Sequence, residues 1–126
     1  MHRQALWSLL SGMSFSFLVA SCDDIPTVFL TAEDFRFVPD FVRVPASVPL
    51  SFSVYNAGRE SHEFDSPILF YAATPVREQT KKSGRPGIEI EPGRSIRLVI
   101  APPPGTYLFI CRRKGHAGMT GTLIVE

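Results

Sequence analysis

Short extended segments, separated by proline and glycine, dominate this sequence from residue 27 onward. The chain holds 11 Pro and 9 Gly, and no stretch keeps the period of about 3.6 residues that a long helix needs. Alternation of apolar and polar side chains, clearest in 50–55, is typical of a strand with one buried face. We expect strands over 27–31, 35–38, 42–44, 50–55, 62–64 continuing through 68–70, 88–91, 95–100, 106–111 and 121–125. About eight strands with turns between them predict an all-β Greek-key sandwich or barrel.

Chain length and charge restrict the class of protein further. At 126 residues the chain has room for one domain. Residues 73–87 are rich in basic, Gly and Pro residues, and we expect a surface loop there. The 13 basic and 12 acidic residues give a net charge of +1, which is too small to hold a nucleic-acid backbone. We therefore expect no nucleic-acid partner, and we expect a monomer.

The first 21 residues are typical of a secretory signal. Residues 1–3 are weakly basic, and 5–20 is uncharged but shorter than a membrane-spanning helix of about 20 apolar residues. The run 19–22 resembles the lipobox of bacterial lipoproteins, which implies cleavage before Cys22 and a lipid on that residue. The alternative is a plain secretory signal with a leftover cysteine. Together with Asp23, the resemblance implies a periplasmic protein anchored to the inner membrane.

The expected organisation is therefore a lipoprotein-type signal at 1–21, a short tether at 22–26 and one domain at 27–126. Removal of the signal leaves few metal-binding side chains: of three His, three Met and two Cys, only His62, His116, Met119 and Cys111 remain beside Cys22. We do not expect a disulfide, so the thiol of Cys111 in an oxidising compartment needs another role.

A mononuclear copper site is the role that these residue types predict. A thiolate with two imidazoles and a weak axial thioether is the donor set of blue-copper sites. Taken singly, each residue has an ordinary alternative, which is core packing for Met119 and Cys111 and a hydrogen-bonded turn for His62.

The order of these four residues resembles the plastocyanin and azurin superfamily, the cupredoxins. Phe109 lies two residues before Cys111, and His116 and Met119 follow in one loop. Other matching segments are Phe37-x-Pro39, 42–44, 54–56 leading to 62–64, Pro92-Gly93 and 104–107. The resemblance implies one copper ion, alternating between Cu(I) and Cu(II), with His62, Cys111 and His116 as strong ligands and Met119 as the axial ligand.

Two positions depart from the common pattern of that superfamily. Many cupredoxins have Asn after the first histidine and Ser or Thr after the cysteine, where this chain has Glu63 and Arg112. We expect these two to form a charged pair that ties the ligand loops together, with Asn56 supporting the turn before His62. The short spacing before Met119 leaves its ligation and the spectral type of the site open.

Basic residues in the ligand loop predict two further effects. Arg112, Arg113 and Lys114 place positive charge near the site, which favours the reduced metal and raises the reduction potential. The same charge steers an acidic partner toward the edge where His116 is expected to emerge, beside the small side chain of Ala117. The alternative is a solvated loop without a partner.

Electron transfer is the function that this sequence favours, with a cytochrome or a membrane oxidoreductase as the partner. The ligand set leaves no open position and no catalytic constellation is recognisable, so we expect no enzyme. Two alternatives stay open: a module that delivers copper to a membrane enzyme, and a copper-free interaction domain.

Overall fold

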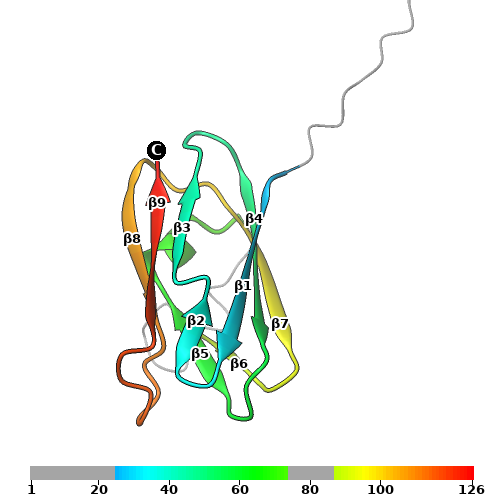
Figure 1. Ribbon diagram of the computed structural model, residues 1–126. Helices are drawn as coiled ribbons and strands as arrows, with labels where there is room; N and C mark the ends of the chain where they lie inside the picture. Colours follow the sequence, from blue (N-terminus) through cyan, green and yellow to red (C-terminus); the bar gives the residue numbers. More distant parts are fainter. Residues whose placement is uncertain (1–24, 74–86) are drawn as a thin grey trace, which may run out of the picture.

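Nine strands and one short 3-10 helix make up residues 25–73 and 87–126, the part of the chain that this computed structural model describes (Figure 1). In chain order they are β1 Thr27–Glu33, β2 Arg36–Val38, β3 Phe41–Val44, β4 Leu50–Asn56, β5 His62–Asp65, η1 Pro67–Tyr71, β6 Gly87–Ile90, β7 Ser95–Ile100, β8 Gly105–Ile110 and β9 Thr120–Val125. The predicted all-β fold is confirmed.

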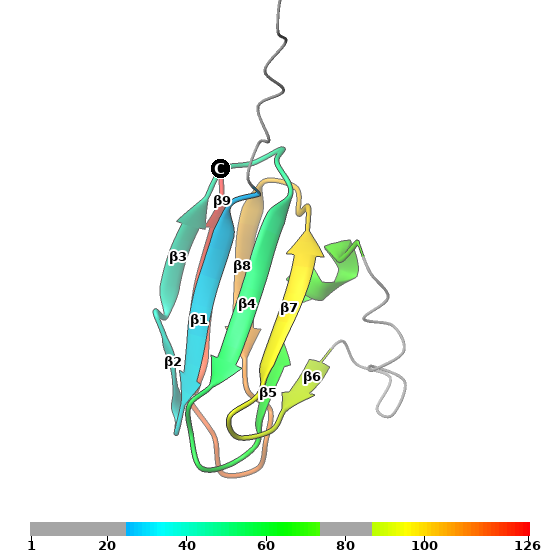
Figure 2. The same ribbon diagram turned by 90° about the vertical axis from the view of Figure 1, so that its right-hand side faces the viewer.

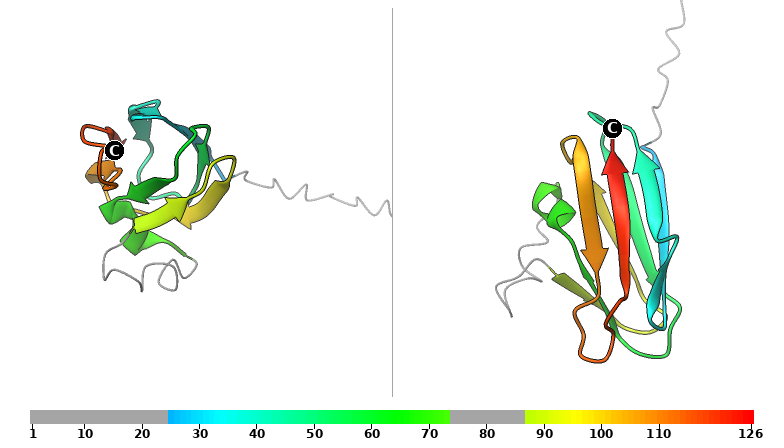
Figure 3. Two further views of the ribbon diagram at one scale, coloured as in Figure 1. Left: turned by 90° about the horizontal axis from the view of Figure 1, so that it is seen from below. Right: turned by 60° about the vertical axis from the view of Figure 1, so that its left-hand side comes forward.

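The strands form two sheets that lie one behind the other (Figures 2 and 3). One sheet has the order β2-β1-β4-β7 and the other β3-β9-β8-β5-β6. β1 runs parallel to β4 and β3 parallel to β9, whereas the other neighbours are antiparallel. Parallel neighbours cannot be joined by a tight hairpin, so the chain crosses repeatedly between the two layers.

Phenylalanines from both layers form the centre of the core. Phe37, Phe52, Phe64 and Phe109 are buried, with ring centroids 5.2–6.1 Å apart. Burying each such side chain stabilises the fold by about 1.5–3 kcal/mol. A Cβ at position 121 would overlap the Phe109 ring, so Gly121 leaves the space that this ring fills.

The expected extension of the fifth strand through 68–70 is wrong. β5 ends at Asp65, and Pro67–Tyr71 forms the 3-10 helix η1. Ser66 causes the change of direction: its hydroxyl donates to the Leu108 carbonyl at 2.7 Å and accepts from the Ile68 amide. Pro67 then takes the first helical position, where a missing N–H costs nothing.

Four chain connections meet at one end of the sandwich, the lower end in Figure 1. They join β1 to β2, β4 to β5, β6 to β7, and β8 to β9. The start of β1 and the C-terminus both lie at the opposite end (Figures 1 and 2). Every predicted copper ligand lies in or beside these connections, so the fold gathers them at the lower end.

Several expectations fall outside the described residues. The signal, the lipidated Cys22 and nearly all of the tether lie in 1–24, and most of the expected surface loop lies in 74–86. Within the described ranges, no helix is long and apolar enough to cross a bilayer.

Candidate metal centre

The two sheets bring three of the predicted ligands together. His62 opens β5, Cys111 directly follows β8, and His116 lies in the connection from β8 to β9. β5 reaches β8 at the pair Asp65–Ile110, so the first histidine and the cysteine approach each other across neighbouring strands. The convergence therefore follows from strand register as well as from the loop itself.

Backbone hydrogen bonds fold the connection 111–119 into a compact loop. The Cys111 amide donates to the Met119 carbonyl at 3.0 Å and closes the base of the loop. Inside it, the His116 amide donates to the Arg113 carbonyl at 3.0 Å, and the Met119 amide donates to the His116 carbonyl at 3.2 Å. Gly115 adopts a φ of 89°, a conformation that glycine reaches without strain. The loop thus holds Cys111 and His116 in fixed relative positions.

The donor atoms of His62, Cys111 and His116 all lie within 4.8 Å of one another. The two Nδ1 atoms are 3.1 Å apart, and the sulfur lies 3.4 Å from His116 Nδ1. The three residues are 0%, 7% and 2% exposed. Two imidazole nitrogens this close, beside a sulfur and shielded from water, need a proton or a cation between them. The geometry therefore fits a metal ion, and a two-histidine, one-thiolate set suits copper.

The sulfur of Cys111 accepts a hydrogen bond from the protein backbone. The amide of Glu63, the residue directly after His62, donates to Sγ at 3.3 Å. A donor aimed at sulfur stabilises negative charge on it. The same amide can donate to a metal-bound thiolate, which is the form of cysteine that binds a metal.

Met119 ends the ligand loop and is 1% exposed. Its main chain closes the loop through the bonds to Cys111 and His116. Axial ligation by its thioether stays a prediction.

Asn56 organises the connection that leads to His62. Its side chain is buried, donates to the carbonyls of Glu60 and Ile90 at 2.8 Å each, and accepts from the Gly58 amide at 2.8 Å. One side chain thus joins the β4–β5 connection to β6 and fixes the path of the chain up to the ligand.

Glu63 and Arg112 do not form the expected pair. The guanidinium of Arg112 donates to the carboxylate of Asp65, so the prediction chose the wrong carboxylate of β5. Burial raises the pKa of Glu63, with repulsion from Asp65 adding to it and attraction from Arg112 opposing it. An ion pair between β5 and the ligand loop exists, but Asp65 supplies it.

The expectation that His116 emerges at the surface is also wrong. Its ring is covered by Phe35, with centroids 5.4 Å apart and edge-on, and by the carboxylate of Glu60. In the same loop, Arg113 pairs with the carboxylate of Glu89 at 2.8 Å. Lys114 and Ala117 are exposed, as a docking surface requires.

Sequence reasoning missed the groups that contact the outer sides of both histidines. Nε2 of His116 donates to Glu60 at 2.8 Å, and Nε2 of His62 lies 3.4 Å from the carboxylate of Asp34. Nε2 of His62 has no hydrogen-bond partner among the described residues. Its contact with the carboxylate of Asp34 is therefore electrostatic. Nothing local marks Asp34, since it is 28 positions from His62 along the chain.

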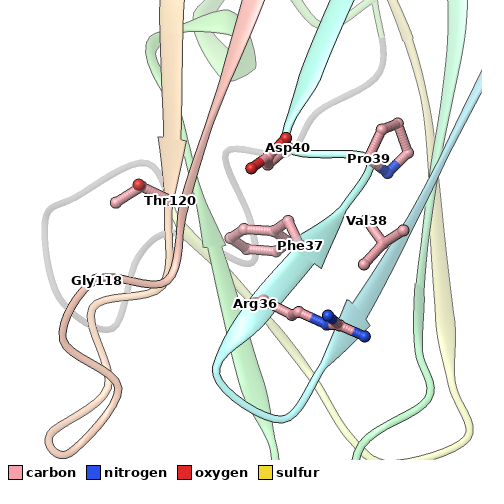
Figure 4. Close-up of a pocket in the computed structure, with 7 residues that line it drawn as sticks. All are labelled: Arg36, Phe37, Val38, Pro39, Asp40, Gly118 and Thr120. Carbon is pink, nitrogen blue, oxygen red and sulfur yellow. The ribbon is translucent and has the colours of Figure 1, made fainter.

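A hollow of about 340 Å³ lies next to the end of the ligand loop (Figure 4). It is lined by Arg36, Phe37, Val38, Pro39, Asp40, Gly118 and Thr120. None of the three clustered donors lines it, so the hollow is separate from the candidate metal centre.

Comparisons with known proteins agree with this geometry. A family model for a cupredoxin-like domain matches residues 5–125. A protein of Rickettsia prowazekii (strain Madrid E) described as uncharacterized protein RP394 is 33% identical over 86 residues, which are 68% of this chain and 57% of that protein. The chain therefore spans little more than half the length of this relative.

Solved structures share the fold at low sequence identity. Reduced auracyanin from Roseiflexus castenholzii is 19% identical with a TM-score of 0.60, covering 79% of this chain and 96% of that one. Auracyanin A of Chloroflexus aurantiacus, described as a blue copper protein, is 22% identical with a TM-score of 0.57 and coverages of 79% and 98%. A multicopper oxidase matches at 19% identity and a TM-score of 0.55, over 79% of this chain and 41% of the enzyme.

Proposed function

The chain belongs to the family of cupredoxin-like domains, and from this we propose that it carries single electrons between redox partners by means of one copper ion. The convergence of three buried donor atoms from His62, Cys111 and His116 is the observation that supports the proposal most directly. Bound copper supplies a one-electron couple. His62, Cys111 and His116 would hold the ion, with Met119 as a weaker fourth donor.

The protein's own residues supply a rigid and dry environment for that couple. The Cys111 thiolate is a soft donor that suits Cu(I), whereas the two imidazoles also suit Cu(II). Asn56 and the closed loop 111–119 hold these donors in place. Donors held in this way would move little between oxidation states, so each transfer would need little reorganisation. Exclusion of water and substrates favours an electron carrier over an enzyme.

The rival function is delivery of copper to another protein. Delivery requires that an accepting ligand reaches the metal and replaces donors one at a time. Here His116 lies beneath Phe35 and Glu60, and His62 is fully buried. Burial of both imidazoles therefore favours a retained ion over one that is passed on.

We further propose a periplasmic location with a lipid anchor at Cys22. The first described residue, Ile25, leads into β1 at the end of the sandwich opposite to the four connections (Figure 1). An anchor there leaves the copper end directed away from the membrane surface. This orientation suits a partner whose redox centre stands above the bilayer, such as a cytochrome domain or the periplasmic part of a membrane oxidoreductase.

Voltammetry combined with competition for the metal distinguishes the two functions. An electron carrier gives a reversible one-electron wave and keeps its copper for hours against a strong chelator in both oxidation states. Rapid loss of Cu(I) to the chelator, with no reversible wave, contradicts electron transfer and supports delivery. The Cys111→Ser variant is the control, because it removes the soft donor.

A further inference from the structure

Each ligand histidine has a carboxylate on the side that faces away from the other donors. Glu60 Oε2 lies 2.8 Å from His116 Nε2, and Asp34 Oδ1 lies 3.4 Å from His62 Nε2. The two imidazoles turn their Nδ1 atoms toward the site and their Nε2 atoms toward the acids. A carboxylate behind each ligating ring is an arrangement that orients the ring and raises its basicity as a ligand.

The carboxylate of Asp34 is held by the loop that carries the other acid. It accepts the Arg59 amide at 3.0 Å, so the connection between β1 and β2 is fastened to the connection between β4 and β5. Gly58 makes the approach possible, because a Cβ there would overlap Asp34 Oδ1 and lie 2.7 Å from His62 Nε2. The acid beside His62 is therefore built into the backbone arrangement.

Phe35 completes the cover over His116. It is 57% exposed and adopts a φ of 70°, although bulky residues rarely take positive φ values. Such a conformation persists only where the surroundings impose it, and here it places the ring edge-on against His116. The hydrogen bond from His116 to Glu60 is consequently shielded on one side by an aromatic ring, although the Glu60 side chain is itself 59% exposed.

We propose that Glu60 is a positioning residue that fixes the His116 ring, that Asp34 adds its negative charge beside His62, and that both selectively stabilise Cu(II), which lowers the reduction potential. This inference rests on the proposed copper function. With Nε2–H donating to the acid, the Nδ1 lone pair is left free to face the other donors. A nearby negative charge also favours the ion of higher charge.

The direction is opposite to that expected from the basic ligand loop. Arg112 and Arg113 are each paired with an acid, Asp65 and Glu89 respectively. Their charges are therefore largely balanced where they lie. The carboxylate of Glu60 instead acts directly on a ligand, through a short hydrogen bond to a buried ring.

The test compares Glu60→Gln with the matched control Glu33→Gln. The glutamine at position 60 keeps an oxygen that accepts from Nε2 but removes the charge. The control removes the same charge from the end of β1, where Glu33 pairs with Arg36 rather than with a histidine. For each protein we measure Cu(II) and Cu(I) affinities, the reduction potential and the Cu(II) absorption and electron paramagnetic resonance spectra.

We expect Glu60→Gln to weaken Cu(II) binding about tenfold relative to Cu(I), which raises the potential by about 59 mV for a one-electron couple. The control leaves that ratio within about twofold. Glu60→Ala also removes the hydrogen bond, so it changes the spectra as well as the potential. Asp34→Asn shifts the potential in the same direction and serves as a second test if Glu60 variants fold poorly.

Equal potentials in Glu60→Gln, Asp34→Asn and Glu33→Gln, with the copper–thiolate absorption band intact, overturn the inference alone. A missing band in the unaltered protein overturns the proposed function and the inference with it. The two failures are thus distinguishable in one set of samples.

Discussion

Replacing Asn56 by alanine tests how the fold delivers His62 to the metal centre. The side chain is fully buried and makes three hydrogen bonds of 2.8 Å, two to carbonyls and one from an amide. These bonds hold the β4–β5 connection at Gly58 and Glu60 and attach it to β6 at Ile90. The substitution leaves all three backbone groups without their partner.

The expected cost is about 3 kcal/mol of unfolding free energy, because each net hydrogen bond contributes about 1 kcal/mol. A loss of this size lowers the urea midpoint by about 1–3 M when the denaturant slope is unchanged. Copper affinity falls as well, since the displaced connection leads directly into His62 and carries the carboxylate of Glu60.

Urea unfolding of the metal-free protein measures the first effect, and a Cu(II) competition titration measures the second. Ser53→Ala is the matched control on β4, because Ser53 alternates to the other face of the strand. Should Asn56→Ala lie within about 0.5 kcal/mol of that control and bind copper normally, the stated role of Asn56 is refuted.

Three further predictions concern Gly121, His62 and Glu63. Gly121→Ala destabilises the fold by about 1–3 kcal/mol in urea unfolding, because the added Cβ overlaps the Phe109 ring. The control Gly105→Ala has little effect, because the nearest contact of its Cβ is an ordinary 3.5 Å. Equal losses of stability in the two variants would contradict this prediction. Burial, together with repulsion from His116, lowers the pKa of His62 from its ordinary value of 6.5. The unfolded chain therefore binds more protons than the folded chain as the pH falls from 7 to 5, and the metal-free protein loses stability. A stability that does not change with pH over this range refutes the prediction. Since burial raises the pKa of Glu63 by penalising its charged form, Glu63→Gln does not destabilise the metal-free protein at pH 7, and a clear loss of stability in thermal unfolding would show that the charge is needed.

The strands and the ligand pair Cys111 and His116 could be predicted because their signals are local, whereas His62, 49 positions before Cys111, is predicted from the resemblance of the ordered ligand set. Alternation over 50–55 reports one buried face, and Cys111 and His116 lie in one short loop between two strands. The apolar run 68–70 is different, because it has strand-like composition but follows Ser66 and Pro67, which start a helical turn. There the capping hydrogen bonds outweigh the composition.

The partner of Arg112 depends on strand register, which the sequence does not reveal. Glu63 and Asp65 are two positions apart on β5 and therefore point to the same face, so both are reasonable partners. The pair Asp65–Ile110 places Asp65 beside the end of β8, two residues before the arginine. A contact between a connection and a distant strand, such as that of Asp34 with His62 at the start of β5, is equally hidden in the sequence.

The visible absorption spectrum of the purified protein with one equivalent of Cu(II) tests the central claim, a copper–thiolate centre at Cys111, most directly. We predict an intense charge-transfer band in the orange-red that disappears on reduction and in Cys111→Ser, and that is lost or strongly altered in His116→Ala. A protein that binds stoichiometric Cu(II) without such a band, or a band that survives in Cys111→Ser, would contradict it.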